Sequence, residues 1–172
     1  MKINVAECSG IELSILRAYR TKKKRGWDML YIAVDLHDTI TCNTYKRNEL
    51  AKKIFFPQAL ETLRYLSSCK EITLILYTSS FPDYLESYYR EMEKAGVHFK
   101  YLNSNPDCLS TDTGDFSNKF YFNIMLDDKA GLNPLKDWKK IYDLIYSIKM
   151  DEIELFCSEG SVEDYLDFKL PL

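Results

Sequence analysis

The sequence of 172 residues has little of what marks a membrane-bound, secreted or strongly charged protein. No apolar run approaches the roughly 20 residues that a membrane-spanning helix requires. The first residues lack the apolar core of a signal peptide. Lysine and arginine number 23 against 26 acidic residues, so the net charge does not indicate a nucleic acid or a membrane surface as partner. We therefore expect a cytoplasmic protein that does not bind membranes.

The five cysteines also lack the arrangement of a disulfide framework or a zinc site. They are odd in number and widely spaced, and no two of them form a C-x-x-C pair. This spacing is typical of reduced thiols in the cytosol. Aromatic residues, in contrast, are abundant, with 13 tyrosines and 9 phenylalanines, which indicates a packed globular protein rather than a disordered one.

Apolar patterns alternate between strands and helices along the chain. Helical spacing and apolar runs predict helices over 10–22, 57–68, 82–95 and 136–148, and strands over 2–8, 29–35, 72–77, 98–102 and 120–126. Strands that alternate with helices of this length are typical of a parallel sheet. We expect one α/β domain of Rossmann-like architecture, with a mostly parallel sheet, helices on both faces and no separate cap domain.

Three parts can be distinguished along the chain. Residues 29–150 carry the alternating pattern and form the expected core, whereas residues 1–28 are an amino-terminal extension and residues 151–172 a tail. The extension contains a basic cluster from Arg17 to Arg25, with six positive residues among nine. Such a run is usually a solvated face, and nucleic-acid contact is the alternative.

Polar side chains follow three of the predicted strands. They are Asp35, Thr78 and Asp127. Taken singly, each has an ordinary interpretation as a turn or helix-cap residue. Right-handed crossovers, however, bring the carboxyl ends of parallel strands to one edge of a sheet, where ligands bind. We therefore expect these three side chains to form one site.

Residues 31–40, YIAVDLHDTI, form an apolar run that ends in an acidic turn with a threonine. This stretch resembles motif I of the haloacid dehalogenase-like phosphohydrolases, written D-x-D-x-T. Asp35 stands at the position of the nucleophile and Thr39 at that of the threonine, while His37 replaces the second aspartate. The resemblance extends over roughly residues 29–148.

The other motifs of the family follow in the expected order. Thr78 and Ser79 close an apolar strand, as in motif II. Lys119 lies eight residues before Asp127, similar to the lysine of motif III. Asp127 and Asp128 resemble the paired acids of motif IV.

The resemblance implies a magnesium-dependent phosphohydrolase that cleaves phosphomonoesters through an aspartyl-phosphate on Asp35. The Mg²⁺ ligands it implies are the carboxylates of Asp35 and Asp127 and the backbone carbonyl of His37, and oxygen donors are those that Mg²⁺ prefers. It places Asp128 in an outer position that orients Lys119. The groups expected to contact the phosphate are Lys119, Thr78 and Ser79.

His37 leaves the proton transfer open. In the family's phosphatases the second aspartate protonates the leaving group and activates water, and such assistance contributes about 10²–10⁴-fold. Histidine, with a pKa near 6.5, is able to do the same, or it only hydrogen-bonds within the turn. The sequence therefore leaves three functions open: an active phosphatase, a degenerate module that binds a phosphate or a partner without turnover, and a phosphatase that processes nucleic-acid ends.

The segment after motif I, residues 41–56, is too short to form a separate cap. Family members without a cap often act on large substrates or borrow a lid from another subunit. We therefore expect a phosphorylated substrate, macromolecules included, and a homo-oligomer. The residues of this segment that we expect to contact such a substrate are Tyr45, Lys46, Arg47, Lys52 and Lys53.

Overall fold

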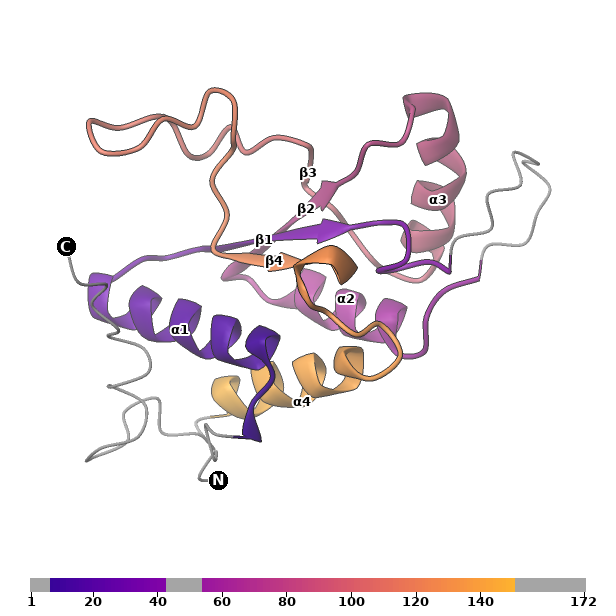
Figure 1. Cartoon of the computed structure of the whole chain (residues 1–172), viewed down its shortest axis with the longest axis horizontal. Coiled ribbons are helices and arrows are strands. Elements are labelled where there is room, and N and C mark those ends of the chain that lie inside the picture. Colours follow the sequence, from indigo (N-terminus) through magenta and orange to yellow (C-terminus); the bar gives the residue numbers. More distant parts are fainter. Residues whose placement is uncertain (1–6, 43–53, 151–172) are drawn as a thin grey trace.

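The computed structural model describes residues 7–42 and 54–150 (Figure 1). The helices are α1 (Gly10–Arg25), α2 (Ala59–Ser68), α3 (Pro82–Lys94) and α4 (Asp137–Lys149), with a short 3-10 turn, η2 (Asp128–Ala130). The strands are β1 (Leu30–Asp35), β2 (Ile72–Tyr77), β3 (Tyr101–Leu102) and β4 (Ile124–Leu126).

The strands form one parallel sheet in the order β3-β2-β1-β4. The central strand β1 pairs with β2 from Leu30 opposite Ile72 to Asp35 opposite Tyr77. On its other side it pairs with β4. Helices flank this sheet, so the expected α/β class with Rossmann-like architecture is confirmed.

One apolar core lies between the sheet and the helices. Along β1, alternate residues Leu30, Ile32 and Val34 are buried in this core, as the two-residue period of a strand requires. Helices α1, α2 and α4 lie together on one side of the sheet (Figure 1). Helix α1 begins with a capping box of Ser9 and Glu12, in which each side chain accepts a hydrogen bond from the other residue's backbone N–H.

The other sheet face is met by the long segment 103–123 between β3 and β4. Tyr31 and Tyr77 point to this face because they alternate with the residues of the helical core. The ring of Tyr31 meets that of Tyr121 at 6.3 Å between centroids, and Tyr77 meets Phe120 at 5.8 Å. Figure 1 shows this segment on the side away from α1, α2 and α4.

Several element boundaries differ from those predicted by periodicity. The predicted strand 98–102 is reduced to Tyr101–Leu102, and 120–126 is reduced to Ile124–Leu126. Before β4, the side-chain oxygen of Asn123 accepts the N–H of Tyr31, so a side chain replaces the backbone partner that a longer strand would supply. Helix α2 begins after Gln58, whose φ of 65° is not helical, and Pro57 therefore precedes the helix.

Some expectations fall on parts of the chain outside the described residues. These are the strand over residues 2–6, the substrate contacts within 43–53 and the tail 151–172. Residues 7 and 8, which are described, are not in a strand. Within the described ranges, no helix has the length and apolar character to cross a membrane.

Candidate active site

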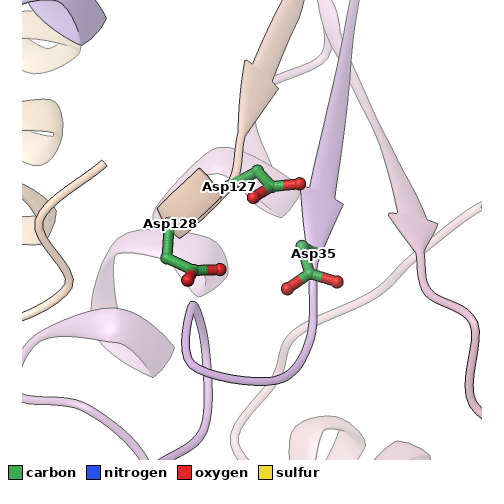
Figure 2. A group of neighbouring side chains, drawn as sticks. All are labelled: Asp35, Asp127 and Asp128. Atoms are coloured by element: carbon green, nitrogen blue, oxygen red, sulfur yellow. The ribbon is translucent and has the colours of Figure 1, made fainter. Parts of the chain in front are cut away.

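Three carboxylates converge at the carboxyl ends of β1 and β4. Asp35 is the last residue of β1, Asp127 follows β4, and Asp128 begins η2. One oxygen from each lies within 4.8 Å of the others (Figure 2). The parallel pairing of β1 with β4 explains this meeting, because it places the ends of both strands at one edge.

The turn after β1 brings Thr39 back toward these carboxylates. Asp38 adopts a φ of 59°, a left-handed conformation that aspartate tolerates better than most residues. The N–H groups of Ile40 and Thr41 both donate to the carbonyl oxygen of Leu36 at 3.0 Å, which closes the turn. The fully buried Thr39 therefore sits between the two acidic segments.

The hydroxyl group of Thr39 connects Asp35, at the end of β1, with Asp128, after β4. Its Oγ1 lies 3.2 Å from Oδ2 of Asp35 and 3.3 Å from Oδ1 of Asp128, and its single proton is shared between these acceptors. The same oxygen accepts the backbone N–H of Asp128 at 3.0 Å. Trp138 donates its indole N–H to the carbonyl oxygen of Thr39 at 3.1 Å, which anchors the turn to α4.

The electrostatics of the group favour binding of a cation or a proton. Burial raises the pKa of Asp35 to about 6, and the charge of Asp127 contributes to the rise. Hydrogen bonds from the Leu36 N–H and from Thr39, together with the charge of Lys129, lower this pKa only in part. A half-buried carboxylate with acidic neighbours is thus stabilised by any positive charge that enters the group.

A lysine that the sequence reasoning missed, Lys129, contacts this group. Its side-chain Nζ lies 3.4 Å from Oδ1 of Asp128, and its backbone N–H donates to Oδ1 of Asp127 at 2.7 Å. The charge of Asp128 raises the pKa of Lys129. Lys119 is exposed within the segment 103–123. The signal that could have found Lys129 is its place directly after the paired acids.

His37 is directed toward the end of β2. Its Nε2 lies 2.7 Å from Oγ of Ser80, and its ring meets that of Tyr88 edge-on at 5.5 Å between centroids. The hydroxyl of Thr78 donates to the same Ser80 oxygen at 3.1 Å and accepts the Ser80 N–H at 3.2 Å. Ser79, next in sequence, is exposed. The structure therefore brings His37 and Thr78 together through Ser80, which sequence reasoning did not identify.

Asn103 holds the backbone of Thr78 in place. The Thr78 N–H donates to Oδ1 of Asn103 at 2.8 Å, and Nδ2 of Asn103 donates to the Thr78 carbonyl oxygen at 2.6 Å. These paired hydrogen bonds join the end of β2 to the first residue after β3. No periodic pattern in the sequence marks Asn103 for this role.

The chemistry of the donor set fits a small, hard divalent cation. Asp35, Asp127 and Asp128 offer carboxylate oxygens, which are the protein ligands that Mg²⁺ prefers. Asp128, expected in an outer position, lies within the same group as the other two. One oxygen of Asp127 already accepts the Lys129 N–H, which orients this carboxylate.

No family model matches the chain, and no curated protein matches it. Among solved structures it is similar to a conserved protein from Bacteroides thetaiotaomicron, at a TM-score of 0.52 and 26% sequence identity. The similarity covers 76% of this chain and 99% of that protein. The chain is thus an α/β protein with a parallel sheet and flanking helices, and its fold is similar to that of this bacterial structure.

Proposed function

We propose that this protein is a magnesium-dependent phosphohydrolase that cleaves phosphomonoesters, with Asp35 as nucleophile. The observation that supports this most is the meeting of three carboxylates, one at the end of β1 and two directly after β4. This is the edge of a parallel sheet at which ligands bind. The order of the motifs along the sequence is the reason for assigning the nucleophilic attack on phosphorus to Asp35 and not to Asp127 or Asp128.

Mg²⁺ would be held by Asp35 and Asp127, with Asp128 within reach and the carbonyl oxygen of His37 as a further donor from the family pattern. Bound there, it would offset the repulsion between an anionic phosphate and the carboxylates. An oxygen of Asp35 forms a bond to phosphorus, and the bond from phosphorus to the ester oxygen breaks. The alcohol leaves with a proton. Water then cleaves the aspartyl-phosphate, which releases phosphate and restores Asp35.

In this scheme His37 carries out both proton transfers: it gives a proton to the leaving alcohol and takes one from the attacking water. Ser80 holds Nε2 of the imidazole, and Thr78 holds Ser80, so the ring has a defined position beside the end of β2. Two lysines are candidates for the positive charge that faces the phosphate. Lys119 is a candidate because of its place in the sequence, and Lys129 because it contacts Asp128. Thr78 and Ser79 would contact the phosphate, and this requires the Thr78 hydroxyl to exchange its bond to Ser80 for one to the substrate.

The experiment that tests the proposal is hydrolysis of an aryl phosphate from pH 5 to 9, with magnesium and with EDTA. We expect turnover that needs both the metal and Asp35, so that Asp35→Asn has none. The matched control is Asp112→Asn, because Asp112 is an exposed aspartate of the segment 103–123. Equal rates for Asp35→Asn and the wild type would contradict the proposal.

The role of His37 is tested by His37→Ala and Ser80→Ala. Removal of a general acid or base typically costs about 10²–10⁴-fold in rate, so His37→Ala is expected to lose at least ~10²-fold in kcat. Ser80→Ala removes the hydroxyl that contacts both His37 and Thr78 but leaves both of these side chains in place, so it is expected to lose less and to change the pH profile of kcat. An unchanged rate for His37→Ala would show that the ring has a structural role.

A binding module without turnover is the second candidate, and the orientation of His37 favours it. The side chain that replaces the second aspartate of motif I packs against Ser80 and Tyr88. This function predicts that phosphate and Mg²⁺ bind, with dependence on Asp127, while no monoester is hydrolysed. Isothermal titration with inorganic phosphate in the presence of Mg²⁺ separates it from the enzyme.

Processing of nucleic-acid ends has weaker support. The basic residues Lys22 to Arg25 form the last turn of α1, where positive side chains stabilise a helix by interacting with its dipole. This gives them an ordinary structural explanation. A nucleic-acid partner would be indicated by binding that weakens steeply with salt and is lost when these residues are neutralised.

A further inference from the structure

The regular pairing between β2 and β3 stops one residue before Asn103. The register ends with Leu76 opposite Leu102, and the N–H of Asn103 donates to the carbonyl oxygen of Leu76 at 2.8 Å. Asn103 itself has a φ of 49°, a left-handed conformation that is not compatible with an extended strand. Thr78, which follows β2, therefore lies beyond the last backbone pair of the two strands.

The side chain of Asn103 continues the pairing with Thr78 in place of a strand. Its Oδ1 accepts the Thr78 N–H at 2.8 Å, and its Nδ2 donates to the Thr78 carbonyl oxygen at 2.6 Å. One planar amide thus satisfies both backbone polar groups of one residue. Among residues that tolerate a left-handed φ, glycine has no side chain and aspartate has no N–H, whereas asparagine offers a donor and an acceptor. This position therefore specifically requires asparagine.

These two hydrogen bonds limit what Thr78 can offer to a ligand. Its backbone N–H and carbonyl oxygen are both bound to Asn103, so the hydroxyl is the donor that remains for a phosphate. The hydroxyl oxygen also accepts the Ser80 N–H at 3.2 Å, which orients the side chain. Ser80 in turn lies 2.7 Å from Nε2 of His37. Asn103 thus begins a series of contacts that leads through Thr78 and Ser80 to the imidazole.

We propose that Asn103 is a positioning residue, which holds Thr78 so that the Thr78 hydroxyl donates to a phosphate oxygen beside Asp35. The place of the phosphate rests on the proposed reaction at Asp35. Asp35 is the register partner of Tyr77, the residue before Thr78, so the held hydroxyl belongs to the strand next to the nucleophile. A group that is fixed before its ligand arrives loses little freedom on binding, and affinity increases accordingly.

The experiment measures binding of inorganic phosphate in the presence of Mg²⁺ by isothermal titration calorimetry. Asn103→Gly removes both hydrogen bonds to Thr78 but suits the left-handed φ, so the path of the backbone is kept. We expect it to bind phosphate about five- to tenfold more weakly than the wild type does. The matched control is Asn118→Gly, the same substitution at an exposed position of the segment 103–123, and we expect wild-type affinity.

A double-mutant cycle with Thr78→Val shows whether Asn103 acts through the Thr78 hydroxyl. Thr78→Val keeps the shape of the side chain without the hydroxyl and is expected to bind phosphate at least about tenfold more weakly. Adding Asn103→Gly to Thr78→Val should weaken binding by less than about twofold, because the group that Asn103 positions is already gone. A purely structural role of Asn103 predicts instead the same loss in both backgrounds.

Circular dichroism must show that each variant folds. Asn103→Ser, whose side chain is too short to reach both backbone groups of Thr78, is a second variant with the same expected loss. Wild-type affinity of Asn103→Gly and Asn103→Ser, or a further five- to tenfold loss when Asn103→Gly is added to Thr78→Val, would overturn the proposal.

Phosphate binding is measured without turnover, so this result is separate from the test of hydrolysis. Binding that depends on Asn103 and Thr78, without hydrolysis of an aryl phosphate, supports the role of Asn103 and counts against the reaction at Asp35. Hydrolysis with KM and kcat unchanged in Asn103→Gly overturns the role of Asn103 and leaves the reaction standing. Neither binding nor hydrolysis by the wild type would overturn both.

Discussion

Replacement of Asp35 by asparagine is expected to stabilise the metal-free protein at neutral pH, although it should abolish activity. The pKa of Asp35 in the folded chain is about 6, raised from 3.8 chiefly by burial. Between these two values the folded state holds a proton that the unfolded state has released. The free energy of unfolding therefore falls as the pH rises from about 4 to 6, and the loss is complete above pH 6.

The magnitude follows from the size of the rise in pKa. A change from 3.8 to about 6 corresponds to about 3 kcal/mol for a group fully shielded from water. Asp35 is only half-buried, so solvent screening reduces this to ~1–2 kcal/mol. The asparagine of the variant avoids this cost, because it keeps the shape of the side chain but carries no charge.

Urea denaturation in EDTA at pH 7.5 and pH 3.5 measures this difference. Asp35→Asn is expected to be more stable than the wild type by ~1–2 kcal/mol at pH 7.5 and nearly equal to it at pH 3.5, where aspartate is largely protonated in both states. Asp112→Asn, at an exposed position, is the control. A variant that is less stable than the wild type at pH 7.5, or equally stabilised at both pH values, would refute the burial argument.

Magnesium should reverse the order of stability. If the ion binds only the folded wild type, a concentration one hundred times its dissociation constant adds about 2.7 kcal/mol. Asp35→Asn lacks one of the proposed ligands and is expected to gain much less. The same urea experiment with magnesium chloride in place of EDTA measures the gain, and an equal gain for both proteins would place the metal elsewhere or exclude specific binding.

Two further predictions concern side chains that the structure brings to the carboxylates. Thr39→Val, at a buried position, leaves the N–H of Asp128 without its acceptor and is expected to lower the free energy of unfolding by ~1–3 kcal/mol. Thr113→Val, at an exposed position, should have little effect in the same urea assay. Lys129→Gln removes a charge that lowers the pKa of Asp35, so this pKa should rise, while Lys119→Gln should leave it unchanged. Carboxyl-carbon NMR titration of the metal-free variants measures the pKa of Asp35. A rise in this pKa in Lys119→Gln but not in Lys129→Gln would show that Lys119 is the lysine whose charge acts on Asp35.

Much of the fold was predictable because it depends on local periodicity. The apolar run of β1 and its two neighbours, with helical spacing between them, predicted the parallel sheet, and the limits of β2 match the prediction, Ile72–Tyr77. The meeting of Asp35 with Asp127 was equally predictable, because parallel register brings the ends of neighbouring strands to one edge. The strands at 98–102 and 120–126 were predicted too long. Lys100 and Asn123 each still donate a backbone N–H to the neighbouring strand, but the Asn123 side chain takes the place of a backbone acceptor for the N–H of Tyr31, and the regular ladder does not continue.

What the sequence by itself determined is thus the order of elements and the acidic edge of the sheet, because both follow from the spacing of apolar residues along single segments. Only the tertiary structure decided which polar groups meet across that edge. Thr39 reaches Asp128, 89 positions away, and Asn103 reaches Thr78, 25 positions away. Such partners depend on the path of turns and of the long segment 103–123, where no periodic pattern constrains the backbone and each hydrogen bond is chosen by proximity in space.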